Sequence, residues 1–142
     1  MGMYLDKYTC YALNVYDEIH ELYKNSEKWN DFFETYIIDD NPIPDVLKAL
    51  KLKTRYDDDG LDKDDAEILI DCVSDEFAYI IIILDVERWS DDYSTENEAV
   101  LKAMAQMPVE KDISDRIYKI YEILFGKTTN KPVFLTKVNH YH

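Results

Sequence analysis

The feature that most constrains the fold is one uninterrupted apolar run, FAYIIIIL, at residues 77–84. Such a run has no polar side to turn toward water, so whatever it forms must be covered on all sides. It is too short to cross a membrane as a helix, which needs about 20 apolar residues. The run is therefore expected to form the central element of a hydrophobic core.

The sequence around this run leaves two interpretations open. In the first, residues 66–89 form one long helix that is amphipathic at its start and apolar on all sides after Phe77. In the second, a helix ends near Ser74 and residues 77–86 form a strand, which their β-branched composition favours. We favour the helix, because a strand needs partners and the only other β-like stretch is KPVFLTKV at 131–138.

Most of the remaining chain has helical patterns, and its scarcity of Gly (3) and Pro (4) also favours helices. The fold class predicted is all-α: a single-domain helical bundle of about five to six helices over residues 1–142, with a buried central helix. The alternative is α+β, with a short strand pair from residues 77–86 and 132–138. Besides the central element, helices are expected over residues 4–24, from Ser26 to Ile37, after Pro44, after a capping box formed by Thr95 and Glu98, and from Ile113 to a C-terminal cap at Gly126.

Charge is the second strong feature. The chain has 30 acidic and 16 basic residues, a net charge of −14. Residues 57–98 contain 16 of the acids and only two bases, Lys63 and Arg88, whereas residues 99–142 have a net charge of +3. An acidic chain is repelled by phosphate backbones and anionic lipid, so direct binding to nucleic acid or to a membrane is disfavoured.

Localisation follows from what the chain lacks. Its first residues show neither the basic start nor the apolar run of a signal peptide. Two cysteines, Cys10 and Cys72, do not make a disulfide framework. We expect a soluble, cytoplasmic protein.

The densest acidic stretch, YDDDGLDKDDAE at residues 56–67, invites interpretation as a calcium loop. An EF-hand loop needs an oxygen ligand at its first position, Gly at its sixth and Glu at its twelfth. With Gly60 at the sixth position, Arg55 occupies the first and Ala66 the twelfth. The stretch is therefore not expected to be an EF-hand, and no metal site is predicted.

Catalysis has weak support. No nucleophile motif or Gly-rich phosphate loop is present. Glu18 with Glu21, and Glu67 with Asp71, have the spacing by which facing helices hold magnesium in nucleotide pyrophosphohydrolases, which gives a helical Mg-dependent enzyme of that kind as an alternative. This spacing is also common on solvated helix faces, so we expect a protein that is not an enzyme and has no cofactor.

The leading hypothesis is a small acidic binding or inhibitor protein. Carboxylates beside aromatic side chains suit a surface that docks on Lys and Arg of a basic, nucleic-acid-binding partner such as a nuclease. Immunity proteins and anti-restriction or anti-CRISPR mimics of nucleic acid use this physics. Two alternatives stay open: an acidic face that only solubilises the chain, and an accessory subunit that binds through an apolar groove. The predicted partner-binding residues are Tyr56, Asp57, Asp58, Asp59, Asp62, Asp64, Asp65, Trp89, Asp91, Asp92, Tyr93, Glu96 and Glu98.

Overall fold

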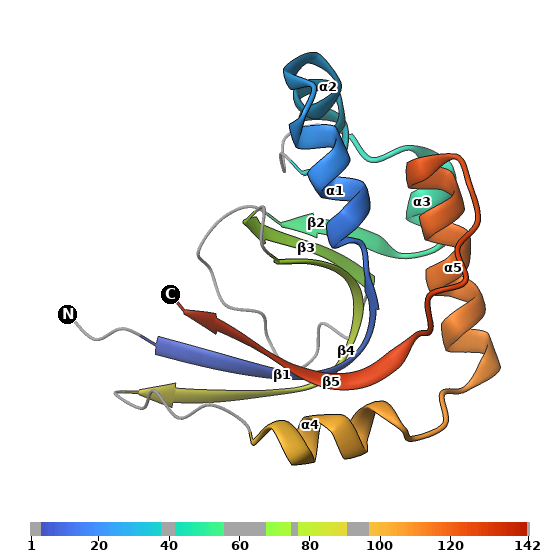
Figure 1. Ribbon diagram of the computed structural model, residues 1–142. Coiled ribbons are helices and arrows are strands. Elements are labelled where there is room, and N and C mark those ends of the chain that lie inside the picture. The colour runs from blue at the N-terminus through green and yellow to red at the C-terminus, as the bar shows by residue number, and fades with distance from the viewer. Residues whose placement is uncertain (1–3, 38–41, 56–67, 75–76, 91–96, 142) are drawn as a thin grey trace.

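The computed structural model describes residues 4–37, 42–55, 68–74, 77–90 and 97–141 (Figure 1). The elements in chain order are β1 (Tyr4–Asn14), α1 (Tyr16–Tyr23), α2 (Ser26–Tyr36), α3 (Asp45–Ala49), β2 (Leu52–Arg55), β3 (Ile68–Ser74), β4 (Phe77–Ser90), α4 (Glu98–Ala105), α5 (Lys111–Phe125) and β5 (Phe134–Tyr141).

The five strands form one sheet in the order β2-β3-β4-β1-β5. β2 and β3 run parallel, and every other neighbouring pair is antiparallel. The fold class is therefore α+β, and the predicted all-α bundle with a buried central helix is wrong. The α+β alternative names the right class but the wrong pairing, because residues 77–86 and 132–138 do not pair with each other. β1 lies between β4 and β5 and pairs with both.

The helix predicted over residues 4–24 is a strand followed by a short helix. Along β1, Tyr8, Cys10 and Ala12 are buried on one face of the sheet, while Leu13 is buried on the other. A central strand with both faces covered has no alternation of apolar and polar residues. Its apolar positions therefore matched the three- and four-residue steps of a helix by coincidence.

The apolar run is also a strand, because β4 replaces the predicted central helix and β3 replaces its amphipathic start. Ile80 and Ile82 pack with the helices, whereas Ile81 and Ile83 pack on the opposite face. β4 and β1 pair with a register shift, since Cys10 lies opposite Ile83 and Thr9 lies opposite Asp85.

The residue left over by this register shift is Leu84, whose exposed fraction is 46%. One extra residue in a strand is a β-bulge, which bends the strand and resets its alternation. The reset explains why Val86 shares a face with Ile81 and Ile83 despite the odd spacing. It also accounts for part of the bend that β1 and β4 show in Figure 1.

The helices cover the sheet and agree better with the sequence patterns. α5 packs against the bend of the sheet and ends at Gly126, whose left-handed backbone (φ 69°) confirms the predicted C-terminal cap. α2 and α3 confirm the helices expected after residues 25 and 44. α4 begins later than predicted, with Asn97 as its cap, since the Asn97 side chain accepts from the Ala99 amide at 2.7 Å. The predicted cap, Thr95, lies outside the described residues.

In the part of the chain that the structure describes, no helix has both the length and the apolar character needed to cross a membrane.

Candidate functional site

Most of the predicted partner-binding residues lie outside the part of the chain that the structure describes. The two exceptions are Trp89, which lies in β4 opposite Leu5 of β1, and Glu98, the exposed first residue of α4. Outside the described residues are Tyr56, Asp57, Asp58, Asp59, Asp62, Asp64, Asp65, Asp91, Asp92, Tyr93 and Glu96.

The strand pairings fix where the two acidic stretches join the sheet. Residues 56–67 connect β2 to β3, and the first residue of β3, Ile68, lies opposite Ile82 of β4. Residues 91–96 follow Ser90 at the end of β4. From Ile82 to Ser90 an extended strand spans at most about 26 Å, at roughly 3.3 Å per residue. One acidic stretch therefore enters β3 beside the middle of β4, and the other leaves from the end of β4.

The part of β4 between these attachment points also contains two acids on one face, with Lys7 of β1 directly opposite Glu87. Asp85 is half-buried and Glu87 is exposed. Two residues apart along a strand, they point to the same side of the sheet, opposite the buried Val86. The described structure thus places two further carboxylates between the acidic stretches.

A different group of acids lies on α1, whose start is built by β1. The Asn14 side chain accepts from the Tyr16 amide at 2.8 Å, and the Val15 amide donates to the Ala78 carbonyl oxygen in β4 at 3.0 Å. Asp17 and Glu18 therefore occupy the first turn of α1, where carboxylates complement the positive end of the helix dipole.

Glu18 is the most buried of these acids, with a side chain that is 8% exposed. Its Oε1 accepts from Lys131 Nζ at 3.3 Å, and the same ammonium lies 3.1 Å from Asp17 Oδ2. Glu18 Oε2 is buried and has no hydrogen-bond partner among the described residues. The carboxylate is thus held at one oxygen and unsatisfied at the other.

Lys131 is positioned by its own backbone, in the segment between α5 and β5. The Tyr118 hydroxyl donates to the Lys131 carbonyl oxygen at 2.7 Å, and the Lys131 amide donates to Thr129 Oγ1 at 3.1 Å. These bonds fix the segment against α5. The ammonium can then reach α1, more than a hundred residues away in sequence.

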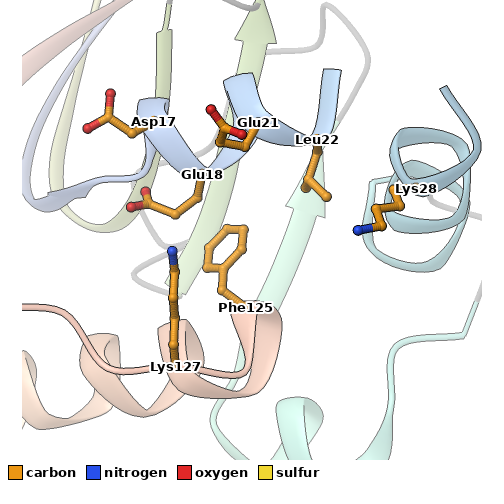
Figure 2. A pocket seen from close by; sticks show the side chains of 7 residues that line it. All are labelled: Asp17, Glu18, Glu21, Leu22, Lys28, Phe125 and Lys127. Carbon is orange, nitrogen blue, oxygen red and sulfur yellow. The ribbon is translucent and has the colours of Figure 1, made fainter. Parts of the chain in front are cut away.

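Beside Glu18 is a cleft of about 300 Å³ between α1, α2 and the end of α5 (Figure 2), which we term the α1 cleft. The carboxylates stand on α1, the Lys28 ammonium reaches in from α2, and the Lys127 ammonium points toward Glu18. Phe125 supplies an apolar surface. The cleft is lined by Asp17, Glu18, Glu21, Leu22, Lys28, Phe125 and Lys127.

Phe125 is held in place by other rings. It stacks on Phe32 of α2 with ring centroids 5.7 Å apart, and the Tyr121 ring lies 5.0 Å away at an angle. These contacts fix the end of α5 against α2. The apolar surface of the α1 cleft is therefore held in place by the rings around it.

Three groups at or near the α1 cleft, those of Tyr121, Lys131 and Glu21, have shifted pKa values. Burial, and then the charge of Glu18, raises the pKa of the Tyr121 hydroxyl. Burial lowers the pKa of Lys131, but the hydrogen bonds to Asp17 and Glu18 outweigh it, so that pKa stands above its usual range. On the exposed rim, the hydrogen bond from Lys24 lowers the pKa of Glu21.

These shifts predict a loss of stability in alkali. The folded chain keeps the protons of Tyr121 and Lys131 to higher pH than the unfolded chain, in which tyrosine and lysine titrate near pH 10 and 10.4. This stabilisation is complete below about pH 10 and is lost as the pH rises through the folded-state pKa values. Urea denaturation between about pH 8 and 11 should show a falling free energy of unfolding. Tyr121→Phe should make the fall shallower, and an unchanged slope in that variant would contradict the assignment to Tyr121.

The structure does not form the arrangement expected for a helical magnesium enzyme. Glu18 and Glu21 do share α1, but Asp71 lies in strand β3, and Glu67 lies outside the described residues. The described residues contain no group of three or more His, Cys, Asp or Glu side chains able to hold a metal ion. Comparison of the chain with protein-family models, curated proteins and solved structures found no match in any of the three.

Sequence reasoning missed the main parts of the α1 cleft. It noticed Glu18 and Glu21 but paired them with acids in another segment. The excess of bases after residue 98 was a signal that the C-terminal segment could supply cations to these acids. It did not indicate which lysine.

Proposed function

We propose that the protein binds a basic surface of another protein through the acid-rich residues 57–98. The observation that carries the proposal is the charge distribution, since this segment contains 16 acids and two bases. Outside it, residues 99–142 have a net positive charge. Acids spread over the whole surface would be enough to keep a protein soluble. A charge imbalance confined to one segment therefore favours binding to a partner of opposite charge.

The strand pairings support the proposal. One acidic stretch enters β3 beside the middle of β4, the other leaves the end of β4, and β4 itself adds Asp85 and Glu87. Acidic stretches whose attachment points on β3 and β4 are up to about 26 Å apart would match a row of cations on a partner, such as those that contact successive phosphates of a nucleic acid.

The partner class follows from this complementarity. A nuclease or other nucleic-acid-binding protein presents Lys and Arg in a groove shaped for phosphates, and an acidic protein can occupy that groove. Immunity proteins and inhibitors that mimic nucleic acid act in this way, and this chain is proposed to be an inhibitor of that kind. Association should be fast and should slow as salt rises, because the charges steer the encounter.

Charge reversal tests the proposal. Asp57→Lys, Asp58→Lys and Asp59→Lys combined should abolish capture of the partner, since they place three cations against a cationic groove. Capture is measured by pull-down from a host lysate with mass spectrometry, at low and at high salt. The expected partner is a basic nucleic-acid-binding protein that the wild type retains at low salt and releases at high salt.

A matched variant separates the position of the charges from their number. Glu27→Lys, Asp31→Lys and Glu122→Lys combined change the net charge by the same amount at three exposed sites on α2 and α5. This control should still capture the partner. Equal loss in both triples would show that only net charge matters, and capture that survives the first triple and high salt would favour an apolar groove instead.

A further inference from the structure

Glu18 Oε2 is the starting point, because it is buried and, among the described residues, makes no hydrogen bond within normal distance and angle, although the Tyr121 hydroxyl lies near the Glu18 carboxylate. Leaving such an atom unsatisfied costs free energy, and the large majority of buried polar atoms in proteins have a partner. Glu18 also lines the α1 cleft. The last torsion of a glutamate side chain is broad, so a small rotation presents Oε2 to a donor placed there.

Glu18 needs a hydrogen-bond donor, whereas two lysines that line the α1 cleft need an anion. Lys24 is paired with Glu21, and Lys131 is paired with Asp17 and Glu18. Among the described residues, the Lys28 and Lys127 ammonium groups form no ion pair. The cleft thus has an acceptor without a hydrogen bond and two lysines that form no ion pair among the described residues.

We propose that the α1 cleft binds a free amino acid with an apolar side chain. The α-ammonium group donates to Glu18, and the α-carboxylate binds the Lys127 ammonium group, which points toward Glu18, while Lys28 lies on the far side of Phe125 (Figure 2). The side chain packs on Phe125 and Leu22. A cavity of about 300 Å³ suits such a ligand, because it is at the small end of the range for small-molecule sites.

Simpler ligands satisfy only half of the cleft. A plain amine meets Glu18 but places a cation beside two lysines without an anion. A plain carboxylate meets the lysines but leaves Glu18 Oε2 unsatisfied. A ligand with an ammonium group and a carboxylate on the same carbon, as in an α-amino acid, meets both requirements.

The test is titration of the full-length protein with L-phenylalanine and L-leucine, followed by NMR chemical shifts and calorimetry. Saturable binding is expected for both. Phenylalaninamide, which lacks the carboxylate, and 3-phenylpropionate, which lacks the ammonium group, should each bind at least about tenfold more weakly than L-phenylalanine, because each loses one charge-assisted contact.

Three variants locate the binding. Glu18→Gln and Lys127→Met should each weaken L-phenylalanine binding about tenfold or more. Lys102→Met, an exposed lysine on α4 that does not line the cleft, should leave it unchanged. Thermal unfolding confirms that each variant is folded, and Lys127, being exposed, can be replaced without disturbing the core.

Three results would overturn the proposal: no saturable binding at millimolar ligand, phenylalaninamide binding as tightly as phenylalanine, or equal effects of Lys127→Met and Lys102→Met. None of them bears on the proposed capture of a basic partner, which concerns residues 57–98.

Discussion

Replacing Ile81 with alanine is expected to lower the free energy of unfolding by about 3 kcal/mol, within the range for truncating a buried isoleucine. Ile81 is fully buried in the middle of β4, where it packs with Tyr8 and Val138 on one face of the sheet. Ile80→Ala should cost a similar amount, because Ile80 is fully buried on the other face. Urea denaturation monitored by circular dichroism measures both losses.

Leu84→Ala is the matched control, since it removes a similar side chain from the same strand. Leu84 is the bulge residue and is 46% exposed, so its replacement should change the free energy of unfolding by about 0.5 kcal/mol. A loss at Leu84 equal to that at Ile81 would contradict the bulge. A small effect at either isoleucine would contradict a strand covered on both faces.

The same burial explains which parts of the fold the sequence could predict. The run 77–84 had to be central, and it is, but burial on both faces removed the alternation that identifies a strand. β1 was hidden for the same reason, because Tyr8, Cys10 and Leu13 are all buried. The argument against a strand at residues 77–86 was that it lacked partners. That argument failed because its neighbours in the sheet, β1 and β3, had both been interpreted as helices.

Elements with one exposed side were easier to predict. α5 buries Ile117, Ile120 and Leu124 at helical spacing, and Gly126 ends it with a backbone that glycine favours. The helix after Asn25 was also predicted, whereas the C-terminal strand appeared only in the α+β alternative, and there with the wrong partner. Predictions from local pattern succeeded where one face meets water and failed where pairing between distant segments decides the structure.

The candidate site shows the same limit. The pattern identified Glu18 as a noteworthy acid on a helix, which is correct. Its partner, Lys131, is 113 residues away in sequence. The two meet because β1 leads directly into α1, which carries Glu18, and because the segment between α5 and β5, which carries Lys131, passes beside α1. No local spacing encodes that contact. The docking hypothesis, by contrast, rests first on the charge along the chain, which is the same whether β4 is a helix or a strand.

Replacing Lys131 with methionine should lower the free energy of unfolding by about 2 kcal/mol, because it leaves a buried carboxylate without its cation. Glu18 is 8% exposed and Lys131 is 34% exposed, so the cost should be smaller than for a fully buried pair. Lys24→Met is the matched control. The Lys24–Glu21 pair is more than half exposed on both sides and screened by water, so its loss should cost much less than the loss of Lys131.

Adding Glu18→Leu to Lys131→Met should recover most of the loss, because it removes the buried charge that the first substitution leaves unpaired. The four chains, wild type, two single variants and the double variant, form a thermodynamic cycle measured by urea denaturation. A double variant whose loss equals the sum of the single losses would show that Glu18 and Lys131 do not interact. A Lys131→Met loss no larger than that of Lys24→Met would show that burial adds nothing to the pair.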